Sequence, residues 1–217
     1  MNGIRAIPVI YNEVKFKSMT EAKMAIFFDL LGFKWEYEPE KFELRNKLSY
    51  IPDFIIHNVN GRVNNQDIYV ECKGNELTDK DWQKLVVFGD FKKKIPSRPF
   101  LIVNDFFWFE RFYKAPSYID NIKARRPRNA YGLWFYALFT VSKETTSDIA
   151  ILCKDKNAHA AVMSESEFYT NADIEATINA FNLTREANFG STHKFTGFNK
   201  NNLPADIDFD PDDIPNF

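Results

Sequence analysis

Two apolar, β-prone segments of the chain carry charged residues. Asp53 follows a proline in "YIPDFII", and Glu71 and Lys73 lie two residues apart in "DIYVECK". Because desolvating a charged side chain costs free energy, charged residues in strands need a partner or a purpose. Side chains alternate between the two faces of a strand, so Glu71 and Lys73 share one face. Val70 and Cys72 point to the other face, where they can fill the core.

The segment between these runs contains Asn60-Gly61, a turn signal that predicts a β-hairpin and places Asp53 beside Glu71. Two carboxylates so close repel each other unless a proton or a cation lies between them. Such hard oxygen ligands suit Mg²⁺ or Mn²⁺. Lys73 can then orient or deprotonate a water that attacks phosphorus, while the cation stabilises the developing charge. This set of groups predicts phosphodiester hydrolysis without a nucleophilic side chain.

The elements around these residues follow from periodicity and caps. The spacing of apolar residues predicts a helix over 18–32, with Ser18 as its cap and Gly32 at its end. Strand-like runs follow over 33–44, 50–56 and 67–73, then a helix over 78–91 and a buried strand over 99–105. The order up to residue 105 is therefore helix, strand, strand, strand, helix, strand. A strand over 148–154 and a helix over 171–188 are predicted further along the chain. The aromatic run 131–141 is compatible with helix or strand.

This layout resembles the PD-(D/E)XK nuclease superfamily, the restriction-endonuclease-like fold. The matching residues are Pro52-Asp53 and Glu71-Cys72-Lys73, with Glu21 in the preceding helix. The resemblance implies that Asp53 and Glu71 are metal ligands, that Lys73 is the catalytic lysine, and that Glu21 assists through a second metal or a water. Gln83 resembles a glutamine that some branches carry after the lysine strand.

The fold class expected from the resemblance is α/β, with a central mixed β-sheet flanked by helices. One domain would span residues 1–199, with a core at about 18–103 and an α/β extension over 104–199. The function expected is Mg²⁺- or Mn²⁺-dependent cleavage of DNA in phage or bacterial replication, recombination or repair. The alternative is a non-catalytic protein that binds nucleic acid and recruits an enzyme. A third reading is an inhibitor or decoy that uses only the tail.

Several of these residues also have ordinary structural explanations. Glu21 lies three residues after Ser18, which makes a capping box. Glu71 and Lys73 would form a solvated pair if their strand lay at a sheet edge, and Gln83 fits an ordinary helix surface. A second E-x-K triplet, at 13–15, has no aspartate strand before it. His57, His159 and His193 are expected to be structural or solvated.

The middle of the chain is basic. Residues 84–128 contain eleven Lys and Arg against four acids. A nuclease must neutralise a phosphate backbone, so these residues are the expected DNA contacts. The candidates are Lys84, Lys92, Lys93, Lys94, Arg98, Arg125, Arg126 and Arg128. The aromatic residues over 106–113 are expected to be core or to stack on unpaired bases.

The last residues are acidic, and residues from about 200 to 217 are expected to be a disordered tail. The tip resembles the acidic tip of bacterial single-stranded-DNA-binding proteins, which implies docking to a replication or repair enzyme. Asn216 interrupts that match. The tail is also compatible with a solubilising role or with covering the protein's own basic surface. The residues that match the tip are Asp212, Asp213, Ile214, Pro215 and Phe217.

Composition limits the remaining possibilities. The chain has 217 residues, a formal net charge of -2 and 22 Phe, which favours one domain with a Phe-rich core. The sequence has no apolar run that would span a bilayer and no signal peptide at its start. Cys72 and Cys153 are expected to be buried thiols of a cytoplasmic protein in a bacterium or a phage-infected host, with a disulfide between them as the alternative. Pairing of two copies as a homodimer, to cut both strands, is left open.

Overall fold

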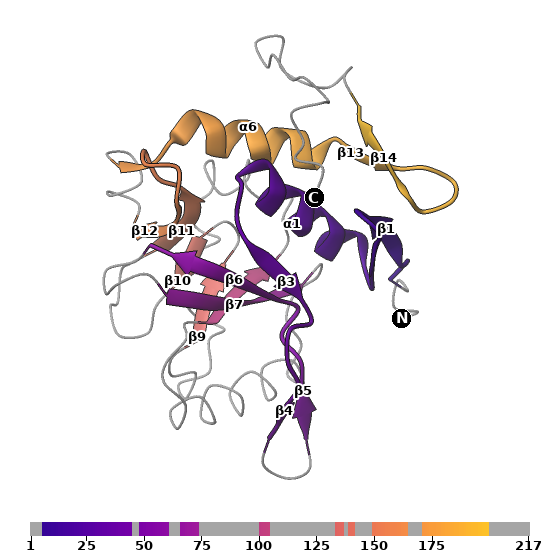
Figure 1. Ribbon diagram of the computed structural model, residues 1–217, viewed down its shortest axis with the longest axis horizontal. Helices are drawn as coiled ribbons and strands as arrows, with labels where there is room; N and C mark the ends of the chain where they lie inside the picture. Colours follow the sequence, from indigo (N-terminus) through magenta and orange to yellow (C-terminus); the bar gives the residue numbers. More distant parts are fainter. Residues whose placement is uncertain are drawn as a thin grey trace, which may run out of the picture.

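The computed structural model describes residues 6–44, 48–60, 66–73, 100–104, 133–136, 139–141, 149–164 and 171–199. These residues form a mixed α/β fold in which two helices lie over the strands (Figure 1). The largest sheet has five strands. In chain order they are β3 (Trp35–Tyr37), β6 (Phe54–Val59), β7 (Gln66–Lys73), β8 (Phe100–Asn104) and β9 (Leu133–Tyr136).

This sheet is mixed, and its spatial order is β3-β6-β7-β8-β9. β3 and β7 both run antiparallel to β6, which lies between them. β8 runs parallel to β7, and β9 runs parallel to β8. The predicted hairpin and the predicted strand over 99–105 are therefore confirmed. The helix predicted over 78–91 lies outside the described residues. β7 has a hydrogen-bonded neighbour on each side, so it is an interior strand.

Smaller sheets surround the main one. β11 lies between β10 and β12, and the other strands form three hairpins, β1 with β2, β4 with β5 and β13 with β14. The strand predicted over 148–154 is confirmed as β11, and the described parts of 131–141 are strands. The bounds are β1 (Val9–Tyr11), β2 (Val14–Phe16), β4 (Phe42–Glu43), β5 (Ser49–Tyr50), β10 (Phe139–Val141), β11 (Ile149–Lys154), β12 (Ala160–Ser164), β13 (Ala187–Phe189) and β14 (Phe195–Phe198).

Helix α1 (Met19–Leu30) forms where the apolar periodicity predicts it. Ser18 is its N-cap, and the Ser18 hydroxyl accepts a hydrogen bond from the backbone N–H of Glu21 at 3.2 Å. The chain leaves the helix at Gly32, whose φ of +71° lies in the left-handed region that glycine adopts without strain. Residues 21–29 are all buried, which follows from the position of α1 between the sheet and a second helix.

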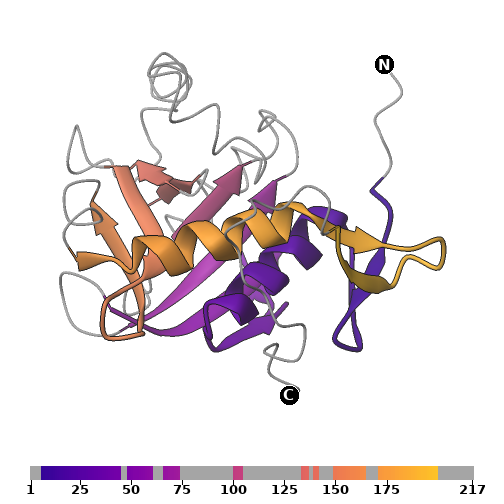
Figure 2. The same ribbon diagram turned by 90° about the horizontal axis from the view of Figure 1, so that it is seen from above.

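That second helix is α6 (Ile174–Arg185), which confirms the helix predicted within 171–188. Asp173 is its N-cap and accepts from the N–H of Ala176 at 3.0 Å. α6 packs against α1 and against β11 (Figure 2). At the end of α6, the buried ammonium of Lys23 donates to the backbone carbonyl of Arg185 at 2.7 Å. A lysine from one helix therefore caps the carboxyl end of the other.

The hairpin of β1 and β2 was not among the predicted elements. Its turn residues Asn12 and Glu13 have φ of 46° and 63°. Two consecutive positive φ angles are typical of a type I′ turn, for which Asn-Gly is the usual sequence signal. Because Glu13 stands where glycine is usual, the sequence hides this hairpin.

The first and last described hairpins meet. The N–H of Ile10 donates to the carbonyl of His193 at 2.8 Å, and β1 contacts β14. The rings of Tyr11 and Phe195 pack edge to face with their centroids 5.2 Å apart. Segments separated by most of the described chain therefore close one end of the molecule (Figure 2).

The core is rich in phenylalanine, as the composition predicts. Phe16, Phe28 and Phe54 are completely buried and come from a hairpin, a helix and the main sheet. The rings of Phe28 and Phe54 meet edge to face at 5.4 Å. Both cysteines are buried and free, which confirms the prediction of buried thiols, and burial raises the pKa of the Cys153 thiol to about 12.

Candidate active site

The hairpin of β6 and β7 brings the two predicted carboxylate positions together. Phe54 pairs with Val70 in the antiparallel register, and continuing that register by one residue sets Asp53 opposite Glu71. The Asp53 carboxylate accepts a hydrogen bond from the backbone N–H of Cys72 at 2.7 Å. Asp53 is therefore in direct contact with the peptide that follows Glu71. The adjacency predicted from the sequence is present, while the metal-binding roles remain predictions.

Glu71 is buried on the face of β7 opposite the main core. Val70 and Cys72 belong to the core cluster, as alternation predicts, whereas only 5% of Glu71 is exposed. The hydroxyl of the buried Tyr50 donates to the Glu71 carboxylate. Burial, and then the negative charge of Glu71, raise the pKa of Tyr50 well above its usual value, so the phenol stays protonated. An interior strand and a buried carboxylate rule out the alternative of a solvated pair at a sheet edge.

Lys73 is the last residue of β7 and pairs with Asn104 of β8. Its backbone continues the strand that carries Glu71, two residues further along. The Lys73 side chain itself lies outside the described part of the chain.

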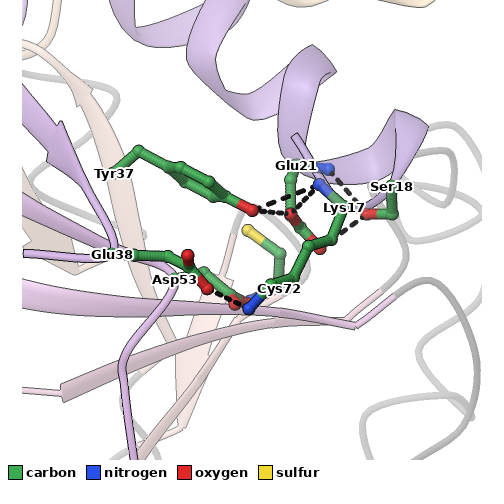
Figure 3. A network of polar contacts seen from close by, with 7 residues as sticks. All are labelled: Lys17, Ser18, Glu21, Tyr37, Glu38, Asp53 and Cys72. Carbon is green, nitrogen blue, oxygen red and sulfur yellow. Dashed lines mark hydrogen bonds and ion pairs between the residues drawn. The ribbon is translucent and has the colours of Figure 1, made fainter. Parts of the chain in front are cut away.

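Glu21 occupies the N-terminal turn of α1, where its carboxylate is surrounded by donors (Figure 3). One oxygen accepts from the backbone N–H of Lys17 at 3.0 Å and from the Tyr37 hydroxyl at 2.5 Å. The other accepts from the Ser18 hydroxyl at 2.8 Å. The predicted capping box is confirmed in the bond from the Glu21 N–H to Ser18, whereas the Glu21 carboxylate accepts from the N–H of Lys17, one residue before the cap. Burial, and then contact with Glu21, raise the pKa of the Tyr37 phenol.

Lys17 and Glu38 complete this edge of the molecule (Figure 3). The Lys17 ammonium donates to the Glu38 carboxylate, and the backbone N–H of Glu38 donates to the carbonyl of Asp53 at 2.8 Å. The hydrogen bond with Glu38 is the main cause that raises the pKa of Lys17; burial opposes it, and the charges of Glu21 and Asp53 add to it. One continuous network thus connects the start of α1 to the start of β6.

Four of these residues were not predicted from the sequence: Lys17, Tyr37, Glu38 and Tyr50. The sequence places two of them near predicted site residues: Lys17 directly precedes the N-cap Ser18, and Tyr50 lies three residues before Asp53. Their contacts with Glu21, Glu38 and Glu71 join residues 16 to 21 positions apart. Spacing along the sequence does not report contacts of that kind.

The two carboxylates from adjacent strands are oxygen ligands of the kind that a hard divalent cation prefers. Mg²⁺ commonly binds through one or two carboxylates and takes its other ligands from water and substrate phosphates. Asp53 and Glu71 match that pattern. Within the described residues, no group of three or more His, Cys, Asp or Glu side chains is placed to bind a metal ion.

The remaining predicted site residues lie outside the described residues. They are Gln83, Lys84, Lys92, Lys93, Lys94, Arg98, Arg125, Arg126 and Arg128, and at the tip Asp212, Asp213, Ile214, Pro215 and Phe217. The three histidines lie on the surface or half-buried, and His57 contacts Glu36 at 3.0 Å and Asp67 at 3.3 Å. In the described segments, no helix is both long and apolar enough to cross a membrane.

Comparison with protein-family models, with curated proteins and with solved structures finds no match to this chain.

Proposed function

We propose that the chain is a metal-dependent nuclease that hydrolyses phosphodiester bonds in DNA. The observation that carries this proposal is the contact of the Asp53 carboxylate with the peptide between Glu71 and Cys72. This hydrogen bond joins the Asp53 side chain to the backbone of the segment that carries Glu71 and Lys73. Asp53 and Glu71 therefore lie side by side on adjacent strands.

The arrangement of elements supports a restriction-endonuclease-like core. A helix precedes three antiparallel strands, and β8 then runs parallel to the strand that carries Glu71 and Lys73. This is the order that the resemblance implies for residues 18–103, apart from the helix predicted over 78–91. The proposal places the activity in phage or bacterial DNA replication, recombination or repair, in the cytoplasm.

In this proposal Asp53 and Glu71 bind Mg²⁺ or Mn²⁺, and Glu21 assists through a second metal or a water. When bound, the cation supplies positive charge for the phosphoryl oxygens and lowers the pKa of a coordinated water. The hydroxyl of Tyr50 donates to one oxygen of Glu71 and would orient this carboxylate toward the cation. Lys73 orients or deprotonates the attacking water.

DNA would contact the basic residues between 84 and 128, and each contact would contribute a salt-dependent share of the affinity. A homodimer would allow both strands to be cut. The acidic tip would either dock a replication or repair enzyme or cover the basic surface of the chain itself.

A specific observation favours a second candidate, a non-catalytic nucleic-acid-binding protein. Glu71 is buried and bonded to Tyr50, and Glu21 already accepts from three donors. Carboxylates used in this way also serve as structural hydrogen-bond acceptors.

A nicking assay separates the two candidates. Supercoiled DNA is incubated with the protein in Mg²⁺, in Mn²⁺ and in EDTA, together with linear, forked and four-way substrates. The nuclease predicts cleavage in metal and none in EDTA. Binding of DNA without cleavage in either metal would contradict the nuclease and support the second candidate.

A further inference from the structure

Lys17 is an exposed charged group at the edge of the molecule where α1 and β6 begin. It lies immediately before the cap of α1, and 67% of its side chain is exposed against 30% for its partner Glu38. Glu21 and Glu71 are buried. The Lys17 ammonium is therefore more accessible to a ligand from solvent than these two carboxylates are.

Glu38 reaches Lys17 from a strained backbone. Its φ is +48°, in the left-handed region that non-glycine residues rarely adopt, and it directly precedes Pro39. This conformation coincides with the ion pair to Lys17 and with the backbone bond to Asp53. Backbone strain of this kind gathers at sites that bind ligands. The backbone conformation of Glu38 is an observation independent of the charges on Lys17 and the carboxylates around it.

The charges at this edge are unbalanced. Among the side chains described there, the three carboxylates of Glu38, Glu21 and Asp53 act on one ammonium, that of Lys17. A phosphodiester anion that approaches three carboxylates is repelled unless cations lie between them. The N-terminus of α1 does not serve as an anion site, because Glu21 and Ser18 already accept there. Lys17 is therefore the described group able to donate to a phosphate.

We propose that Lys17 is a positioning residue that binds a non-bridging phosphate oxygen of the substrate strand, exchanging its ion pair with Glu38 for that contact. The inference rests on the proposed nuclease function and adds a phosphate contact outside the Glu71–Lys73 segment. An exposed ion pair contributes little to stability, so Lys17 exchanges partners at low cost.

The experiment compares Lys17→Met with Lys15→Met, a matched control because Lys15 is exposed on β2 only two residues away. DNA binding is measured in EDTA over a range of salt concentrations. Removing one phosphate contact should flatten the slope of log K against log salt by about one unit in Lys17→Met and leave it unchanged in Lys15→Met. Glu38→Gln should tighten binding, because it frees Lys17.

Steady-state cleavage in Mg²⁺ supplies the second measurement. A contact made equally in the ground state and the transition state changes KM and not kcat. Lys17→Met should therefore raise KM about tenfold with kcat nearly unchanged, and Lys15→Met should match the wild type.

The outcomes separate this inference from the proposed function. If the wild type cleaves and Lys17→Met matches Lys15→Met in both salt slope and KM, the inference is wrong and the nuclease stands. If the wild type cleaves DNA in neither Mg²⁺ nor Mn²⁺, the proposed nuclease function is wrong. The salt slope of DNA binding still decides whether Lys17 contacts phosphate. A lower melting temperature in Lys17→Met and Glu38→Gln with unchanged salt slopes would make the pair structural and overturn the inference.

Discussion

The N-terminal edge of α1 and the contact between α1 and α6 each place a lysine beside charged groups, six residues apart. Lys17 is exposed, and a hydrogen bond to Glu38 raises its pKa. Lys23 is only 4% exposed, and burial lowers its pKa to about 8, against the attraction of Glu186. The charged form of Lys17 is stabilised at the surface, whereas the charged form of Lys23 is destabilised by burial. Desolvation thus outweighs the nearby carboxylate at Lys23, whereas the hydrogen bond to Glu38 outweighs desolvation at Lys17.

The largest expected effect is on the N-terminal edge. Asp53→Asn or Glu71→Gln should reduce metal-dependent cleavage by more than about 100-fold, because outer partners of metal ligands alone account for 10- to 100-fold. Binding of DNA in EDTA should persist. The measurement is a single-turnover cleavage rate.

The matched control is Glu13→Gln, in the exposed E-x-K triplet of the first hairpin. Lys23→Met should also cleave normally, since it alters only the contact with α6. Wild-type turnover in either carboxylate variant would disprove the metal assignment.

The next effect is a pH dependence at the contact with α6. The pKa of Lys23 falls from 10.5 to about 8 on folding, so the unfolded chain binds more protons between these pH values. The stability of the native protein should therefore rise with pH across this window, by up to about 3 kcal/mol, as each pKa unit is worth about 1.4 kcal/mol. Urea unfolding of the wild type and of Lys23→Met between pH 7 and 10.5 measures the difference.

Lys23→Met is expected to match or exceed the wild type in stability at pH 7 and to lose that advantage by pH 10.5. The groups that face Lys23 are Glu186, whose charge opposes the shift, and Arg185, whose charge adds to it. A gap between the two proteins that stays constant with pH would show that Lys23 does not titrate in this window.

Tyr50→Phe tests the contact that fixes Glu71. Removing the hydroxyl leaves a buried carboxylate without that donor, which should cost about 2 kcal/mol in the free energy of unfolding. Mg²⁺ should recover part of the loss if Glu71 binds the cation, because a ligand that binds only the native state stabilises it. Urea titrations with and without Mg²⁺ check this, and an equal deficit in both would place the cation elsewhere.

The smallest effect is at the cap of α1. Ser18→Ala should cost about 1 kcal/mol, equivalent to a fall in melting temperature of roughly 2–4 °C for a chain of this size. Ser18→Thr should retain most of the stability, since its hydroxyl also caps. An unchanged melting temperature in Ser18→Ala would mean that Glu21 satisfies the helix start by itself.

Local features of the fold were predictable from the sequence. The helices at 19–30 and 174–185 have caps and periodic apolar residues, and the hairpin that carries Asp53 and Glu71 alternates as strands do. The hairpin at 9–16 was missed because its turn has Glu13 at the position where glycine gives the signal.

The candidate site was predictable only in part. The adjacency of Asp53 and Glu71 follows from strand pairing, which the sequence encodes locally. The bonds of Tyr50 to Glu71, Lys17 to Glu38 and Lys23 to the end of α6 depend on tertiary packing. Propensity and spacing carry no information about such contacts, so only the structure reveals them.

The junction of the first and last described hairpins has a consequence for synthesis. Ile10 bonds to His193, and Lys23 caps α6 at Arg185, so the N-terminal hairpin and α1 find these partners only after about 190 residues have been translated. At 5–20 residues per second, that is a delay on the order of ten seconds or more. Through that interval the side of α1 that packs against α6 lacks its partner, while β1, β2 and β7 are already available to the rest of the helix. We therefore expect folding to finish only after α6 has been synthesised.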